Sequence, residues 1–387
     1  MKRPTEKGEN VKKTVEFLKL APRRVIMTVL SAAVIIAHLL TRSDHELNVL
    51  LTERLVRPAH RFLSVAASHV PFSVAEVLVG LFVLWVVVYL ISQIVFLIRE
   101  GQRIRRLLLL MLTVLCVGLT IYAAFCVLWG IYYYSDDFAT QSGLDAGPVE
   151  IEELRAVTIY FASLANEYAK LVPRDENGVC SFDRDAVLAR SDEVYRAAEE
   201  MYPCLQAPDI RAKGVHFSRI VSYIDFTGFF FPFTAEANVN TDFPTSLFPS
   251  TVAHELAHQR GVAKEQEANF CAVLSSLEYG DPEYCYSACL LAYTHLGNAL
   301  YQADRTTWSG VYSSLSEEVL TDFAANREYW KQFDTPVRKA YNTVYENFLY
   351  SFDQSYGLRS YGKCVDLLVH YYIDDARELL ANPRITD

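Results

Sequence analysis

The residues best suited to chemistry in this chain are His254, Glu255 and His258, which form the pattern H-E-x-x-H. On a helix, residues four apart share a face, so both imidazoles can bind one Zn²⁺. Glu255 is rotated by about 100° from His254 and lies beside such an ion, where a metallopeptidase keeps its general base. Gly261 follows and can adopt the left-handed conformation that ends a helix. The pattern therefore predicts a catalytic zinc site on a helix.

A carboxylate is the usual third ligand when two histidines hold a catalytic zinc ion. Two acids, Glu265 and Glu267, follow the motif within easy reach of it. If both lie on one helix, residues two apart point about 160° from each other, given about 100° of rotation per residue. The residue types alone therefore predict that one of these acids binds the metal, and they leave both as candidates.

Three long apolar stretches lie in the N-terminal third, at Val25–Leu40, Val77–Ile98 and Leu107–Tyr132. The second and third can each cross the hydrocarbon layer of about 30 Å. Buried core helices of this length usually show a polar face, and these stretches show none. The first is shorter and follows a basic leader, but it ends without the small-residue pattern of a signal-peptide cleavage site. We therefore expect three retained membrane spans.

The arrangement of basic residues predicts the orientation, because cytoplasmic loops are rich in Lys and Arg. Eight basic residues lie within residues 1–24, and four arginines lie in the short connection 99–106. Both segments are expected in the cytoplasm, although the loop 41–76 also carries four arginines. The expected organisation is a basic cytoplasmic tail (1–24), a membrane domain with three transmembrane helices (25–132) and an extracytoplasmic domain (133–387).

Composition limits the partners. The formal net charge of -10 makes a nucleic-acid partner unfavourable. The expected partners are the lipid bilayer and a peptide or protein substrate. Of eight cysteines, six follow residue 133. In an extracytoplasmic domain these six could form disulfides or stay free thiols, and the sequence does not decide between the two.

Periodicity predicts that the part after residue 133 is mainly α-helical, with two or three short strands in Val215–Asn240. A strand at the edge of the cleft would pair with an extended substrate, and the candidates are Asn238, Val239 and Asn240, or Phe229–Phe233. Helices are predicted at residues 151–171, 182–205, 264–279, 283–301, 315–332, 336–350 and 361–382.

The order of strands, metal helix and second helix resembles the zincin peptidases. Glu265-Gln266-Glu267-Ala268-Asn269 is similar to the E-x-x-A-N pattern that gluzincin-like peptidases carry after H-E-x-x-H. This resemblance implies that Glu265 is the third ligand and that Asn269 supports the ligands from outside the coordination sphere. The spacing from His258 to Glu265 is shorter than in the better-known gluzincins, so Glu267 remains the alternative ligand.

The wider chain resembles a bacterial multi-pass membrane family, domain of unknown function 3810, within the zincin superfamily. The stretches that carry the likeness begin at Pro71, Pro232, His254 and Gly357. The resemblance implies three transmembrane helices followed by a mostly helical zincin-like α+β domain with a small sheet. The expected function is a membrane-anchored zinc metallopeptidase acting on an extracytoplasmic protein or peptide. The alternative is a non-catalytic sensor or scaffold that zinc stabilises.

Overall fold

The computed structural model describes residues 21–99, 103–144, 147–336 and 362–382, with isolated positions between 338 and 347. The chain divides into two compact units. The first contains Met1–Val56 and Glu76–Tyr134, and the second contains Arg57–Ala75 and Ser135–Asp387. Residues 57–75, which the sequence analysis grouped with the membrane domain, therefore pack with the C-terminal part of the chain.

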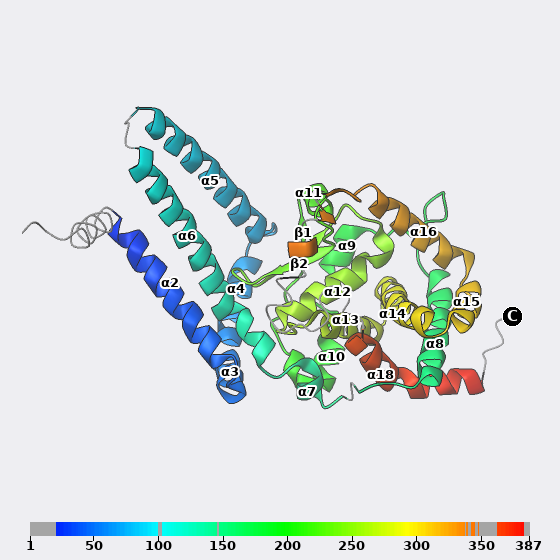
Figure 1. The fold of residues 1–387 in the computed structure, drawn as a ribbon. Helices are drawn as coiled ribbons and strands as arrows, with labels where there is room; N and C mark the ends of the chain where they lie inside the picture. Colours follow the sequence, from blue (N-terminus) through cyan, green and yellow to red (C-terminus); the bar gives the residue numbers. More distant parts are fainter. Residues whose placement is uncertain are drawn as a thin grey trace, which may run out of the picture. The chain divides into compact units, whose positions relative to one another are not determined.

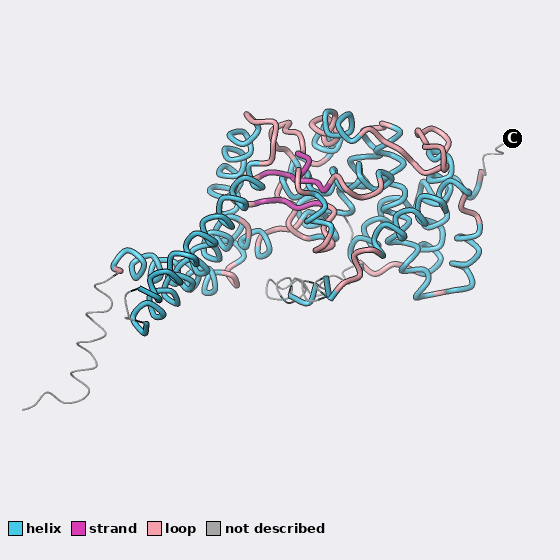
Figure 2. Tube along the Cα trace, turned by 90° about the horizontal axis from the view of Figure 1, so that it is seen from above, coloured by secondary structure: helices cyan, strands magenta, loops and turns pink. Residues whose placement is uncertain are grey.

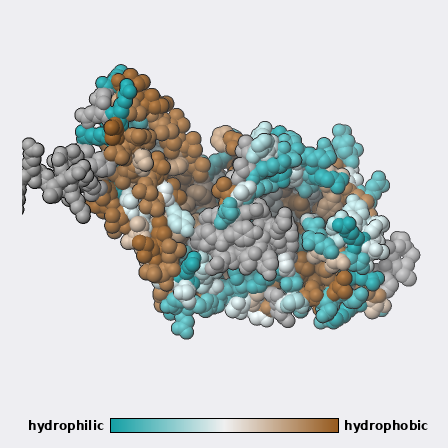
Figure 3. Space-filling model, in the orientation of Figure 1, coloured by the Kyte–Doolittle hydropathy of each residue, from teal (hydrophilic) through white to brown (hydrophobic). Residues whose placement is uncertain are grey.

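The first unit is built on three long apolar helices, α2 (Pro22–Thr41), α5 (Val74–Arg99) and α6 (Arg103–Leu128). Each is long and apolar enough to cross a membrane, in agreement with the predicted spans. Their side chains are largely exposed, and hydrophobic residues cover this unit in Figure 3. The shorter elements are α3 (His45–Leu51), the π-helix η1 (Thr52–Val56) and the 3-10 helix η2 (Gly130–Tyr134).

The second unit is mainly helical, as predicted (Figure 1). Its core lies among α8, α12, α13, α14 and α18, and contains fully buried side chains such as Phe161, Leu256 and Phe270. The helices are α4 (Arg57–Ser68), α7 (Phe138–Ser142), α8 (Ile151–Ala169), α9 (Arg184–Ala189), α10 (Arg196–Met201), α11 (Ser218–Ser222), α12 (Phe248–Gln259), α13 (Glu265–Tyr279), α14 (Pro282–Ala303), α15 (Arg305–Ser313), α16 (Glu317–Lys331) and α18 (Gly362–Ala381), with 3-10 turns η3 (Pro203–Leu205) and η4 (Thr245–Leu247).

A small three-stranded sheet precedes α12, and its strands lie side by side in Figure 2. The strands are β1 (Lys213–Val215), β2 (Gly228–Phe231) and β3 (Glu236–Asn240), in the order β1-β3-β2. β1 runs parallel to β3, and β2 runs antiparallel to it. Because β3 is bonded on both sides, the edge role predicted for Asn238, Val239 and Asn240 is wrong, and β1 and β2 are the edge strands of the described sheet.

Two other expectations need correction or lie outside the described residues. The single helix predicted over residues 182–205 is interrupted, because α9 ends at Ala189 and α10 begins only at Arg196. The Ser191 hydroxyl donates to the carbonyl of Leu188 and accepts from the Ala212 N–H, so it takes part in bonds that compete with a continuous helix. Most of the helix predicted at 336–350 lies outside the described residues.

Candidate metal centre

Helix α12 carries the H-E-x-x-H residues and is held between the sheet and two other helices. It packs against β2 and β3 on one side and against α13 and α14 on the other. Pro249 lies in its first turn, where the missing N–H breaks no helical hydrogen bond. Gly261 then adopts a φ of 89°, which turns the chain toward α13 at little steric cost. The Gly261 prediction is thereby confirmed.

The turn brings three ligand atoms together. Glu265 is the first residue of α13, and its Oε2 lies 3.2 Å from His254 Nε2 and 3.6 Å from His258 Nε2. The three ligand atoms all lie within 4.8 Å of one another. Residues from two helices therefore point toward one small volume, which is the arrangement that a shared metal ion requires.

Both histidines are oriented by partners on their other ring nitrogen. The Nδ1 of His254 lies 2.9 Å from the Oδ1 of Asn269, and the Nδ1 of His258 lies 2.6 Å from the carbonyl oxygen of Val262. An Nδ1–H that donates to these oxygens leaves the Nε2 lone pair pointing toward Glu265. Such partners fix the tautomer and raise the basicity of a ligating histidine. Asn269 thus contacts His254, one of the two candidate ligand histidines.

Glu255 is buried beside this cluster. Its side chain is buried, and its Oε2 has no hydrogen-bond partner among the described residues. Burial raises the pKa of Glu255 to about 7, because an ionised carboxylate loses solvation there. A buried acid oxygen without a partner indicates that the site accommodates a further polar group.

Gly228, the first residue of β2, is a site residue that sequence reasoning missed. A Cβ atom at this position would lie 2.6 Å from Glu255 Oε1, a distance that real Cβ atoms essentially never show. The edge strand therefore passes directly against the carboxylate only because residue 228 is glycine. The sequence analysis used this segment only as a candidate strand, since nothing in the sequence shows that it approaches Glu255.

The donor set fits zinc. Two imidazole nitrogens and one carboxylate oxygen are typical zinc donors. Among the described residues, no fourth His, Cys, Asp or Glu joins the group. Three protein ligands and an open position are typical of catalytic zinc sites, whereas structural sites are closed by four ligands.

Glu267, the alternative ligand, has a different set of partners. Its carboxylate accepts hydrogen bonds from the N–H groups of Phe138 and Ala139, at 2.8 and 3.2 Å. Lys363 Nζ lies 3.3 Å from its Oε1. Glu267 is 1% exposed and binds the start of α7. Of the two acids, only Glu265 belongs to the group that could hold a metal ion.

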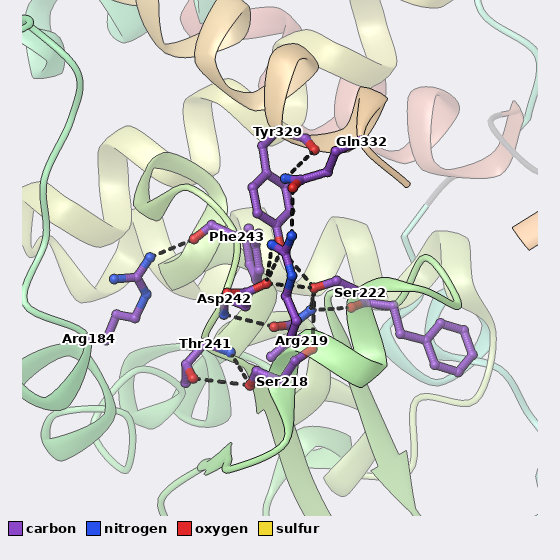
Figure 4. Close-up of polar contacts among 11 residues, drawn as sticks. Arg184, Ser218, Arg219, Ser222, Thr241, Asp242, Phe243, Tyr329 and Gln332 are labelled. Carbon is purple, nitrogen blue, oxygen red and sulfur yellow. Dashed lines mark hydrogen bonds and ion pairs between the residues drawn. The ribbon is translucent and has the colours of Figure 1, made fainter. Parts of the chain in front are cut away.

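A separate polar network holds the loop between β3 and α12 (Figure 4). The carboxylate of Asp242 accepts hydrogen bonds from Tyr329 Oη at 2.7 Å and from Arg219 Nη1 at 3.1 Å. The N–H of Thr241 donates to Ser218 Oγ at 2.7 Å. These contacts join the loop to α11 and α16, and so fix the chain a few residues before the metal helix begins.

Comparison with models of protein families shows which family the chain belongs to. The model of the family described as "Protein of unknown function (DUF3810)" matches residues 52–369. The chain belongs to the DUF3810 family. The matched part of this DUF3810 chain includes α12, α13 and the sheet, and therefore the whole candidate centre. No curated protein and no solved structure matches the chain.

Proposed function

We propose that this DUF3810 protein is a membrane-anchored, zinc-dependent metallopeptidase of the zincin type. The observation that carries the proposal is the convergence of His254, His258 and Glu265, with the buried carboxylate of Glu255 beside them. A zinc ion held only for structure gives no reason to bury beside it an acid whose Oε2 has no hydrogen-bond partner among the described residues. That acid favours catalysis over the alternative of a sensor or scaffold.

The side chains have distinct roles in the proposed reaction. Zn²⁺ supplies Lewis acidity when bound, which polarises a carbonyl group and lowers the pKa of water. Glu255 accepts a proton from the attacking water and passes it to the leaving amine. Burial raises the pKa of Glu255 in the metal-free protein, which favours this role, because a shuttling acid works best when its pKa is near the operating pH. Asn269 and Val262 hold the two histidines in their ligating orientation.

The edge strand offers a binding surface for an extended peptide. β2 pairs with β3 on one side, and its other side is the edge of the sheet. A peptide can add to such an edge through main-chain hydrogen bonds, which recognise a backbone without demanding one sequence. Because Gly228 lies against Glu255, a peptide paired with β2 passes close to the general base.

The cellular location is also part of the proposal. Three apolar helices can cross a membrane, and the basic leader favours a cytoplasmic N-terminus. With three spans and a cytoplasmic N-terminus, the proposed location of the candidate centre is the extracytoplasmic side. Protease digestion of intact spheroplasts tests this placement, and complete protection of residues after 135 would reverse it.

The function is tested by Glu255→Gln, which keeps the shape of the side chain and removes the proton acceptor. We expect zinc content to be unchanged and hydrolysis of a peptide library to fall by about 10²–10⁴-fold. Glu317→Gln, at an exposed first-turn acid of α16, is the control. If the unsubstituted protein binds zinc but cleaves no peptide, the scaffold alternative gains support. If Glu255→Gln cleaves at the normal rate, Glu255 is not the base.

A further inference from the structure

Helix α4 has one face buried in the second unit and an opposite face that is exposed and apolar. His60 and Ser64 are each 3% exposed, and the His60 ring lies 5.5 Å from the ring of Phe230 in β2. On the other face, Phe62 is 73% exposed and Val65 is 43% exposed. The helix therefore binds the edge strand with one side and presents large apolar groups on the other.

The arginines of α4 do not make its exposed face polar. Arg57 Nη1 donates to the carbonyl of Cys204 at 2.9 Å, and Arg61 Nη2 donates to the carbonyl of Gln206 at 3.1 Å. Both guanidinium groups thus bind to the second unit. Beyond the helix, Phe72 adds another apolar side chain, 52% exposed.

A buried ion pair connects this segment to the start of a candidate span. Lys213 Nζ lies 2.7 Å from Glu236 Oε1 and donates to the carbonyls of Ala67 and Phe72 at 2.8 and 3.0 Å. Glu236 also accepts from the N–H groups of Val74 and Ala75, at 3.0 and 2.8 Å. These two residues belong to the second unit and begin α5, an apolar helix of 26 residues.

The end of a membrane span lies at the lipid–water interface. Residues 57–73 immediately precede that end, and Glu236 of β3 accepts hydrogen bonds from its first two residues. Apolar side chains on an amphipathic helix at this depth are stabilised when they enter the boundary between headgroups and acyl chains. The occupant that fits the exposed face of α4 is therefore lipid, which also surrounds the span that follows.

We propose that Phe62, Val65 and Phe72 lie in the lipid headgroup layer, so that the candidate centre takes peptide segments held at the membrane surface. The substrate class rests on the proposed peptidase function, whereas the lipid contact does not. Phe230 lies two residues from Gly228, about 7 Å along the strand, and a helix is about 10 Å across. The centre is then about 15–20 Å from the layer, a distance that about five or six extended residues span.

Spin labels test the lipid contact in the full chain reconstituted in phosphatidylcholine vesicles. The nitroxide is attached at Phe62→Cys and, as the matched control, at Leu171→Cys, where the native side chain is 64% exposed. The unsubstituted protein gives the background from natural cysteines. We expect the label at 62 to collide with dissolved oxygen more than with a water-soluble nickel complex, and the label at 171 to show the reverse. Equal access of nickel to both labels would overturn the proposal.

A series of lipid-anchored peptides tests the substrate class. Each peptide carries the same cleavable sequence, separated from the anchor by spacers of two to ten residues. We expect cleavage to concentrate about five or six residues from the anchor. If cleavage depends on the peptide sequence alone and is the same for every spacer length, the inference is contradicted. If no peptide is cut at all, the proposed peptidase function fails, and the label result still decides whether α4 meets lipid.

Discussion

The first turn of α13 has two sides that differ sharply. On one side Glu265 faces His254 and His258, and its side chain is 31% exposed. On the other side Glu267 is 1% exposed and binds the N–H groups at the start of α7. The sequence predicted Glu265 as the third ligand with Glu267 as the alternative, and the structure gives the two acids different partners. One is available to a metal, and the other fixes the segment that follows the third apolar helix.

The difference shows why the metal side can remain open. The first turn of α13 is held through Glu267, Lys363 and the pair of Lys264 with Asp137, whose atoms lie 2.6 Å apart. These ion pairs lie on the Glu267 side of the turn, away from the three candidate ligand atoms.

The largest effect on the Glu267 side is expected from Glu267→Ala. The change leaves two buried N–H groups without an acceptor, and each such group costs about 1–3 kcal/mol. We therefore expect a loss of about 2–6 kcal/mol in the free energy of unfolding of the second unit. Chemical denaturation measures the loss, with Glu317→Ala at an exposed first-turn acid as the control. A loss no larger than that of the control would show that Glu267 does not hold this turn.

Much of the fold follows from patterns that the sequence displays directly. The three spans and the helices at α8, α13, α14, α16 and α18 agree with the predicted ranges to within a few residues. The His254 and His258 pair follows from a spacing that any helix converts into one face. The strand order could not be derived, because period-two patterns say nothing about which strand lies in the middle.

Contacts between segments that lie far apart in the sequence could not be predicted from it either. Glu267 meets Phe138, and Gly228 meets Glu255, across long separations in sequence. The sequence analysis missed α4 because it treated residues 41–76 as a loop between two spans. The apolar and polar residues of α4 lie on two different faces of the helix. Such contacts depend on the final packing, and a single sequence contains no local signal for them.

The next effect is expected from Gly228→Ala on the metal side. The added methyl group would overlap the carboxylate of Glu255, which must move to make room. A displacement of about 1 Å at a reacting group can reduce the rate by about 10²-fold. We expect turnover to fall by that order while zinc content is kept. Gly214→Ala in β1, whose added methyl would meet the Thr241 side chain, is the matched control and should retain turnover.

Asn269→Ala should have a smaller effect on the same side. It removes the acceptor that orients His254, and losing such a partner typically costs about 10–100-fold in metal affinity. Competition with a chelator measures the change. Asn326→Ala, which removes a similar acceptor from Trp330 on α16, is the control. Equal zinc affinities in the two variants would remove the supporting role assigned to Asn269.

The smallest effect concerns pH. Burial opposes the charge on His258, but the neighbouring carboxylate of Glu265 outweighs it and raises the pKa of His258 to about 9 in the metal-free protein. Below that pH zinc must displace a proton, so zinc affinity should rise up to about tenfold per pH unit between 7 and 9. Calorimetry in buffers of different ionisation enthalpy should detect close to one proton released at pH 7.5. Binding without proton release would contradict this.

The most direct test of the central claim is to compare zinc affinity in Glu265→Ala and Glu267→Ala side by side. The account predicts that Glu265→Ala loses far more than the about 100-fold that an outer partner can cost. Glu267→Ala should keep zinc under conditions in which it is folded, checked by circular dichroism in each sample. If Glu267→Ala loses the metal while Glu265→Ala keeps it, the assignment of ligands is wrong and the proposed centre falls with it.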